Sequence, residues 1–317
     1  MSLLFRAWLC SLLMVLQGCS FDDGRPLKIA TNLWPGYEPL YLAQNIGAYG
    51  GEAEVIQLAS ATEVMRALRH GSIDGAGLTM DETLTLMSQG TDLVVLLALD
   101  FSRGGDAILG MPNSGVFSLR GKRVGVENTA VGSLVLSEAL IQGQVALDEI
   151  DVVNISADQH ESALLNGKVD FVVTFEPAKS RLLGAGARVL FDTTQAPELV
   201  VDVLVVRRDA FKKRRQAVIS LLRGYYNARA YMNTNRSESM GFFSKRLKLD
   251  EEQIQESFAG LHLPTLQENM DWFSGEPSAY EHNIHNTMAI LRQRKIVTNE
   301  FKLVVYSDAT WLQEVAR

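Results

Sequence analysis

Two kinds of hydrophobic pattern alternate along the chain from Leu27 onwards. Short apolar runs predict buried strands, and the segments between them carry apolar residues at helical spacing and end near Gly. The first series of predicted strands is LKIAT (27–31), AEVIQL (53–58), GAGL (75–78) and LVVLLALD (93–100). Strands that alternate with helices in this way predict an α/β fold with a parallel sheet.

A second series of the same kind follows the Gly-rich segment FSRGGD. Its predicted strands are KRVGVE (122–127), EIDVVNI (149–155), DFVVTFE (170–176) and ARVLFD (187–192). The run LVVDVLVVRRD (199–209) is long and apolar enough to be a strand that crosses from one unit to the other. The remainder is helical in pattern and predicts no further sheet. Its longest amphipathic pieces are AVISLLRGYYNARAYMN and YEHNIHNTMAILRQRK.

This order predicts two α/β lobes, with the second inserted into the first. Residues 27–103 and 200–317 are expected to form the first lobe with its C-terminal helices, and residues 104–199 the second. The two crossings, near 101–107 and 192–200, would act as a hinge. A two-lobed fold with such a hinge is expected to close around a ligand between the lobes.

The N-terminus has the features of an export signal. A positive charge at Arg6 precedes the apolar run AWLCSLLMVL, which is too short to span a bilayer comfortably. The sequence LQGC that follows resembles a bacterial lipoprotein box, which would make Cys19 the lipidated first residue of the mature protein. Residues 1–18 are therefore expected to be a lipoprotein signal peptide and 19–26 an anchor linker. The alternative is an ordinary signal peptide with a chance Cys, and the sequence leaves open which membrane holds the anchor.

Charge and cysteine content narrow the function classes. The 317 residues carry a net charge of −7 and no large basic cluster, so the positive footprint of a nucleic-acid-binding protein is missing. The only two cysteines are Cys10 and Cys19. Because Cys10 leaves with the signal, the mature chain is expected to have no disulfide and no cysteine metal site.

Four segments together resemble a known family. They are IATNLWPGYEPLYLAQNIGAY, LRHGSIDGAGLT, LRGKRVGVENTAVGSLVL and LLNGKVDFVVTFEP, in this order. The chain from about Leu27 to Asp209 is similar to the periplasmic substrate-binding proteins of ABC importers, in the branch that serves nitrate, sulfonates, taurine and thiamine precursors. The resemblance implies a type II periplasmic-binding fold, high-affinity capture of a small solute, and delivery to a permease in the inner membrane. It implies no catalysis and no cofactor, and we expect a monomer.

The loop after the first predicted strand is the first candidate for ligand contact. In open α/β sheets, ligands bind beyond the carboxyl ends of the strands. The loop that begins at Asn32 leaves the sheet there, so Trp34 and Tyr37 are predicted to form an apolar wall of the ligand site. The alternative is that both aromatic side chains cap the core of their own lobe.

Hydroxyl residues at helix entries are further candidates. Ser60 or Thr62 in SATEV and Thr129 in ENTAVGS can cap helices, which leaves N–H groups free for an oxygen-bearing ligand group. Thr79, after the third predicted strand, is a further candidate for ligand contact. Simple capping without ligand contact is the alternative for each residue.

Acidic residues gather at the same strand ends. The candidates are Asp81, Asp106, Glu127 and Glu176, with Asp81 and Glu176 as the first choices, and Glu82 and Asp100 lie beside this set. Like charges repel in a cleft of low dielectric constant, so a receptor for a simple anion would avoid so many carboxylates. The pattern predicts a ligand with a positive or hydrogen-bond-donating nitrogen: an amine, an amino-pyrimidine or a zwitterion, of which a taurine-like sulfonate is one.

Other classes of protein find less support in the sequence. There is no G-x-S-x-G elbow, P-loop or dinucleotide-binding glycine motif. His282 and His285 lie one helical turn apart, but no third metal ligand is in view, so we expect a solvated helix face and no metal. An enzyme on the same fold, such as a yeast-type pyrimidine synthase or a menaquinone-pathway enzyme, is disfavoured by the export signal. A ligand sensor that feeds a membrane kinase or cyclase stays open beside transport.

Overall fold

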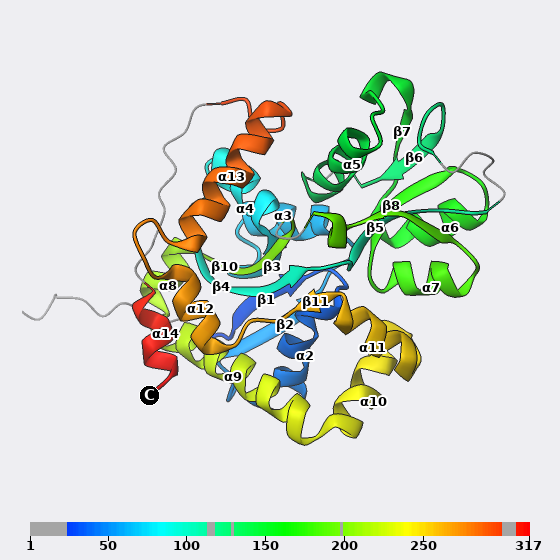
Figure 1. Ribbon diagram of the computed structural model, residues 1–317. Coiled ribbons are helices and arrows are strands. Elements are labelled where there is room, and N and C mark those ends of the chain that lie inside the picture. Colours follow the sequence, from blue (N-terminus) through cyan, green and yellow to red (C-terminus); the bar gives the residue numbers. More distant parts are fainter. Residues whose placement is uncertain (1–23, 113–117, 128–129, 197–198, 300–308) are drawn as a thin grey trace, which may run out of the picture.

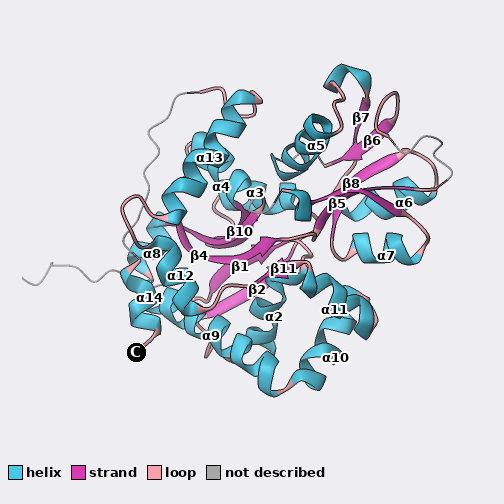
Figure 2. Cartoon of the chain, in the orientation of Figure 1, coloured by secondary structure: helices cyan, strands magenta, loops and turns pink. Residues whose placement is uncertain are grey.

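The computed structural model describes residues 24–112, 118–127, 130–196, 199–299 and 309–317. Two β-sheets, each flanked by helices, lie side by side (Figures 1 and 2). We call the six-stranded sheet with its helices the first lobe and the five-stranded sheet with its helices the second lobe. The predicted signal peptide, the lipidation site Cys19 and most of the anchor linker lie outside the described residues.

The first lobe is built on strands from both ends of the chain. Its strand order is β11-β4-β10-β3-β1-β2. The strands are β1 (Leu27–Thr31), β2 (Ala53–Gln57), β3 (Gly75–Thr79), β4 (Leu93–Ser102), β10 (Val201–Arg207) and β11 (Leu261–His262). Strands β1, β3, β4 and β10 are almost completely buried, which explains their continuous apolar runs.

The second lobe has the strand order β7-β6-β8-β5-β9. Its strands are β5 (Asp106–Gly110), β6 (Arg123–Val126), β7 (Asp151–Asn154), β8 (Phe171–Phe175) and β9 (Arg188–Asp192). The edge strands β7 and β9 are largely exposed, whereas β5 and β8 are buried. This lobe has its own apolar core, centred on residues such as Phe171 and Leu182.

The prediction of a parallel sheet is wrong in part, because both sheets are mixed. Strand β10 runs antiparallel to β3 and β4, and β5 runs antiparallel to β8 and β9. The physical reason is the path of the chain: β4 leads directly into β5 of the other sheet, and β9 leads back into β10. Strands β5 and β10 therefore enter their sheets from the side where the other strands end. The residue bounds of the two predicted lobes stay a prediction.

Helices cover both faces of each sheet (Figure 2). In the N-terminal part of the first lobe they are α2 (Glu38–Asn45), α3 (Ala61–Arg69) and α4 (Met80–Ser88). In the second lobe they are α5 (Ala130–Gln142), α6 (His160–Leu165) and α7 (Ala178–Gly184). Short 3₁₀ turns are η2 (Pro35–Tyr37), η3 (Leu147–Glu149), η4 (Ala157–Gln159) and η5 (Thr193–Gln195).

The C-terminal helices pack on the first lobe, as Figure 1 shows. They are α8 (Arg208–Lys213), α9 (Arg215–Thr234), α10 (Arg236–Leu247), α11 (Glu251–Ala259), α12 (Leu266–Phe273), α13 (Ala279–Gln293) and α14 (Thr310–Val315). Their buried residues, among them Phe243 and Leu291, belong to one core cluster with β1, β4 and β10. In α14, Trp311 donates from Nε1 to the Leu96 carbonyl over 2.8 Å.

Among the described residues, no helix combines the length and apolar character needed to cross a bilayer.

Candidate ligand-binding site

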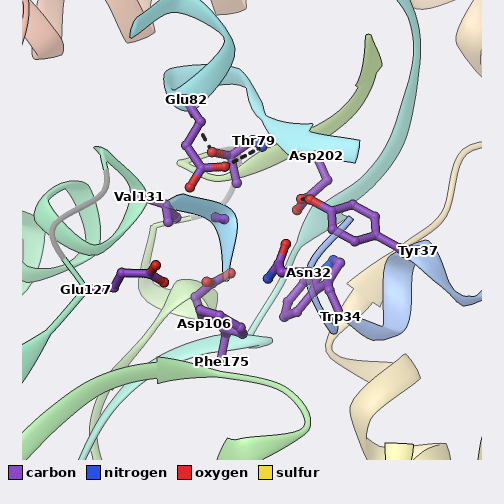
Figure 3. Close-up of a pocket in the computed structure, with 11 residues that line it drawn as sticks. Asn32, Trp34, Tyr37, Thr79, Glu82, Asp106, Glu127, Val131, Phe175 and Asp202 are labelled. Atoms are coloured by element: carbon purple, nitrogen blue, oxygen red, sulfur yellow. Dashed lines mark hydrogen bonds between the residues drawn. The ribbon is translucent and has the colours of Figure 1, made fainter. Parts of the chain in front are cut away.

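A cavity lies where the two sheets face each other, at the ends of their strands (Figure 3). It encloses about 340 Å³ of space, counting the part that opens to solvent. Both lobes contribute to its lining, which consists of Asn32, Trp34, Tyr37, Ala61, Thr79, Glu82 and Asp202 from the first lobe and Asp106, Glu127, Val131 and Phe175 from the second. The cavity is therefore small, and a solute that it holds is small too.

The segment Trp34-Pro35-Gly36-Tyr37 forms one wall of the cavity. Pro35 begins a 3₁₀ turn, for which its fixed φ is suited, and Trp34 donates a 2.9 Å hydrogen bond from Nε1 to Oδ2 of Asp100. A Cβ atom on Gly36 would lie 1.8 Å from that same carboxylate oxygen. The Pro-Gly break is therefore required because the backbone passes directly over the Trp34–Asp100 hydrogen bond.

Trp34 also reaches the second lobe. Its indole packs edge-on against Phe175 of β8, with ring centroids 5.9 Å apart at an interplanar angle of 81°. A Cβ atom on Gly105, in the connection between β4 and β5, would lie 2.6 Å from the Trp34 ring. Trp34 is thus held between the connection and both lobes, and only 4% of its surface is exposed. The ring belongs to the core of its lobe and also lines the cavity, and its contact with a ligand stays a prediction.

Tyr37, in the same wall of the cavity, is hydrogen-bonded to the carboxyl group of Asp202. Its hydroxyl donates a short hydrogen bond to Oδ1 of Asp202. Asp202 lies within β10, opposite Thr79 of β3 and opposite Asp100 of β4 in the sheet register. This position places Asp100 and Asp202 side by side at the end of the first sheet.

The entry of α4 supplies Thr79 and Glu82. The Thr79 hydroxyl accepts from the Glu82 amide at 3.4 Å, and Oε2 of Glu82 accepts from the Thr79 amide at 3.1 Å, which makes a capping box. The box fixes the direction of the Glu82 side chain into the cavity (Figure 3). Its other oxygen, Oε1, is buried and finds no hydrogen-bond partner among the residues that the structure describes.

The second lobe contributes two carboxyl groups from strand ends. Asp106 begins β5, and its amide donates to the Ser102 hydroxyl over 3.2 Å, while its Oδ2 is buried without a hydrogen-bond partner in the described part of the chain. Glu127 follows β6 and accepts a 2.8 Å hydrogen bond from the hydroxyl of Thr62. Because Thr62 belongs to α3, this bond joins the two lobes at the rim of the cavity.

Burial shifts the protonation of these carboxyl groups. Burial, together with the charge of Asp81, raises the pKa of Glu82 to about 8. Burial raises the pKa of Asp106 to about 7, against the opposing effect of the Ser102 hydroxyl. Burial and the neighbouring Asp100 raise the pKa of Asp202 well above its usual range. Asp100 itself has a pKa of about 7, also raised mainly by burial.

The protein offers these carboxyl groups little positive charge. No Lys, Arg or His side chain is among the described residues that line the cavity. Two basic groups near this cluster bind elsewhere: Lys179 donates to the Gly104 carbonyl at 2.8 Å, and Arg229 donates to the carbonyls of Leu263 and Pro264 at 3.1 Å each. Near neutral pH the raised pKa values therefore keep much of this carboxyl cluster protonated, and a cation in the cavity would favour the ionised forms.

The structure brings together about half of the predicted site residues. Those that line the cavity are Asn32, Trp34, Tyr37, Thr79, Asp106 and Glu127. Four others lie beside it: Ser60 caps α3 by accepting from the Glu63 amide, Thr62 binds Glu127, Asp81 is buried at the start of α4, and Glu176 follows β8. Thr129 lies outside the described residues.

The two first choices from the sequence do not line the cavity. Glu176 is occupied within its own lobe, because its carboxylate accepts from the Ser180 amide at 3.0 Å and lies 3.4 Å from the Lys179 ammonium. Asp81 is completely buried next to the lining residue Glu82, and burial raises its pKa to about 6. Any direct contact of Asp81 or Glu176 with a ligand stays a prediction.

Sequence reasoning missed five lining residues: Ala61, Glu82, Val131, Phe175 and Asp202. Asp202 could have been found, since it is the single charged residue inside the apolar run LVVDVLVV. Glu82 could also have been found, because T-x-x-E is a capping-box pattern that aims the Glu back at the strand end. Val131 and Phe175 carry no such signal.

The lining of the cavity contains carboxyl groups, one amide, two hydroxyls and aromatic faces, which suit a cation with an apolar part. Among the described residues, no three His, Cys, Asp or Glu side chains are grouped so that they could hold a metal ion.

Comparison with known proteins connects this geometry to a family. The model of a family described as NMT1-like matches residues 23–241. No curated protein sequence matches the chain.

Several solved structures share the fold. The ligand binding component of an ABC-type import system from Staphylococcus aureus, with zinc bound, is 15% identical, with a TM-score of 0.73 over 92% of this chain and 99% of that one. The periplasmic aliphatic sulphonate binding protein SsuA from Escherichia coli is 19% identical, with a TM-score of 0.68 and the same coverage. The Candida albicans CA3427 gene product, described as having the generic periplasmic binding protein fold, is 15% identical, with a TM-score of 0.67 over 92% and 94%. The predicted two-lobed periplasmic-binding fold is confirmed.

Proposed function

The chain belongs to the NMT1-like family, and on that basis we propose that it is the solute-binding component of an ABC importer and captures a small nitrogen-bearing cation between its lobes. The lining of the cavity is the observation that supports a positively charged ligand. Four carboxyl groups, those of Glu82, Asp106, Glu127 and Asp202, line it without a basic side chain among the described residues there. A cation would replace the missing counter-charge.

Each part of the lining has a role in this proposal. The carboxyl groups pair with the positive nitrogen, and Trp34 and Phe175 pack against the apolar part of the solute. Asn32 supplies an amide for a further hydrogen bond. Closure brings the charge of Asp106 and Glu127 to a ligand already held by the first lobe, and water leaves the site, which strengthens the pairing. No chemical conversion of the solute is part of the proposal.

The solved structures with the same fold support a role of this protein in solute transport. The S. aureus protein is named as a component of an import system and the E. coli protein as a periplasmic sulphonate binder. By analogy, we propose that this protein acts as a monomer in the periplasm, held to a membrane through a lipid on Cys19, and passes its solute to a permease. The ligand differs from a sulfonate in this proposal, because a second anion would be repelled by the carboxylates.

A thermal-shift panel tests the proposed function. The chain from Ser20, which contains every described helix and strand, is freed of bound solute by partial unfolding and refolding. It is then tested with alkylamines, diamines and amino-pyrimidines, and separately with nitrate, taurine and alkylsulfonates. A ligand at about 100 times its dissociation constant adds roughly 2.7 kcal/mol of stability, which raises the melting temperature by a few degrees. Stabilisation by nitrogen cations supports the proposal, and stabilisation only by nitrate or sulfonates refutes it.

A further inference from the structure

We propose that the solute is a dication, with one ammonium or amidinium group bound by the carboxyl groups of the first lobe and another by those of the second lobe. This inference rests on the proposed function and defines the class of its ligand. It comes from two buried carboxylate oxygens, one in each lobe, that face the cavity without a partner.

The first of these oxygens is Oε1 of Glu82. The carboxyl group is fixed by the capping box, in which Oε2 accepts from the Thr79 amide. The residue is 98% buried, with 2% of its surface exposed, yet Oε1 has no hydrogen-bond partner among the described residues. Buried polar atoms in native proteins are nearly always hydrogen-bonded, so an oxygen held in place without a partner points to a ligand atom.

The second oxygen is Oδ2 of Asp106, in the other lobe. Asp106 is 4% exposed and begins β5, where the backbone fixes its position. Its Oδ2 likewise lacks a hydrogen-bond partner within the described residues. Glu127 lies next to it in the cavity lining, with one oxygen bound to Thr62.

These two groups approach the cavity from different sides. In Figure 3, Glu82 extends from the α4 side, Asp106 and Glu127 lie on the opposite side, and Asp202 lies beside Tyr37 at a third edge. Asn32, Trp34 and Phe175 also line this space. The arrangement offers a carboxyl group at each end and amide and aromatic surface along the walls, which matches two cationic nitrogens joined by a short apolar spacer.

The charge of the closed site also favours two positive groups. A solute with a single ammonium group pairs with the carboxyl groups of one lobe and leaves those of the other without a counter-charge when the lobes close. Because an unpaired buried charge is strongly unfavourable, those groups then keep their protons and add nothing to the binding. A dication pairs with both lobes, so its binding and the closure of the lobes stabilise each other.

A divalent metal ion is the other way to supply two charges. The described residues contain no group of three acidic or histidine side chains placed to hold a metal ion. An organic dication therefore fits the site better than a metal ion does.

Isothermal titration calorimetry with paired probes tests this inference. The chain from Ser20 is titrated with the diamines from 1,3-diaminopropane to 1,6-diaminohexane and with butylamine, which has one nitrogen. Magnesium and calcium chloride serve as metal probes. We expect the best diamine to bind about tenfold or more tightly than butylamine, because it pairs with a carboxylate in each lobe.

Two variants, one in each lobe, show whether both ends of the diamine are bound. Glu82→Gln and Asp106→Asn should each weaken binding of the best diamine by about tenfold or more, while at most one of them should weaken butylamine as strongly. Glu54→Gln, which changes an exposed residue of β2, is the matched control and should leave both affinities unchanged. Circular dichroism and melting temperature verify that each variant is folded.

The possible outcomes separate the inference from the proposed function. Equal affinity for diamine and butylamine, or a loss in only one of the two variants, overturns the dication and leaves a singly charged amine as the ligand. Saturable binding of a metal ion in place of every amine also overturns it. Binding of sulfonates or nitrate without binding of any amine overturns the inference and the proposed function together.

Discussion

The hydroxyl of Thr62 donates a 2.8 Å hydrogen bond to a carboxylate oxygen of Glu127. Thr62 lies in the first turn of α3 in the first lobe, and Glu127 follows β6 in the second. A second contact between the lobes comes from Arg294, after α13, which donates to the carbonyls of Ser133 and Leu134 on α5 at 3.2 and 3.0 Å. The lobes are thus joined directly on the side of the cavity where the acidic residues gather.

Replacement of Thr62 by Val should shift the protein towards an open arrangement. A hydrogen bond to a carboxylate contributes about 1–3 kcal/mol, and this one exists only when the lobes are together. The chain from Ser20 contains no cysteine, so Cys residues introduced at the exposed positions Glu54 and Asp151, one in each sheet, can carry a fluorescent donor and acceptor. We expect longer dye separations in Thr62→Val than in the parent.

Thr62→Ser is the matched control for this change, because it keeps the hydroxyl. Its dye separations should equal those of the parent. Identical distributions in the parent and in Thr62→Val would show that the hydrogen bond does not contribute to closure.

Replacement of Gly36 by Ala should destabilise the protein. The added methyl group would lie 1.8 Å from Oδ2 of Asp100 and 2.6 Å from Nε1 of Trp34, so the hydrogen bond between these two residues has to break or the loop has to move. Overpacking of this kind costs about 1–3 kcal/mol, and an unpaired Asp100 adds to that cost. Urea unfolding measures the change in the free energy of unfolding.

Gly241 provides the matched control within helix α10. A Cβ atom there meets no heavy atom within 4 Å, and Ala has the better helix propensity. Gly241→Ala should therefore raise the free energy of unfolding slightly, by at most about 1 kcal/mol. Equal effects of the two substitutions would contradict the proposed role of Gly36.

The ligand-free protein should lose stability as the pH rises above about 6.5. The pKa values of Asp100 and Asp106 are raised to about 7 and that of Glu82 to about 8, chiefly by burial. These groups are ionised in the unfolded chain at that pH but still hold protons in the folded one. Since the folded state binds more protons, deprotonation favours unfolding until the pH has passed the folded pKa values.

Other groups in the protein do not reverse this trend within that range. Burial lowers the pKa of His160 to about 4, so its opposing contribution builds up towards the unfolded pKa of about 6.5 and is nearly complete one pH unit above it. Lys179 and Arg229 weaken the shifts of Asp106 and Asp100 but do not remove them. Glu38, which is paired with Arg246, has a pKa raised to about 7 by burial and adds to the same trend.

Urea unfolding at about pH 6.5 and about pH 8.5, at constant ionic strength, measures this dependence. We expect the free energy of unfolding to be lower at the higher pH, and we expect Glu82→Gln to reduce the difference because it removes one titrating group. A stability that rises over this range would contradict the protonated state of the cavity carboxyls.

The sequence pattern was sufficient to place most of the strands. The runs at 27–31, 53–58 and 75–78 become β1, β2 and β3 almost residue for residue, because buried strands need continuous apolar sequence. Strand β5 was not predicted, since DAILG follows the Gly-rich connection without a preceding helix. The antiparallel direction of β5 and β10 depends on which strands pair across the sheet, which the local pattern does not encode.

The sequence predicted where the site lies in the fold and that it is acidic, but not all of the residues that line it. The strand-end rule led to Trp34 and Tyr37, because the loop after a buried strand faces the cavity edge in an open α/β sheet, and the predicted hinge led to Asp106. The choice between Asp81 and Glu82 needed the geometry of the capping box. Asp202 lies on a strand that returns from the other lobe, and its meeting with Tyr37, 165 positions earlier, follows only from the tertiary fold.

The central claim is that the cavity selects positive over negative solutes, and a titration of matched probes tests it most directly. Calorimetry of the ligand-free chain from Ser20 compares 1,4-diaminobutane with butane-1,4-disulfonate, which have the same carbon chain and opposite charge. We expect saturable binding of the diamine and none of the disulfonate, because Glu82, Asp106 and Asp202 line the site without a basic side chain among the described lining residues. Saturable binding of the disulfonate, with none of the diamine, would contradict the account.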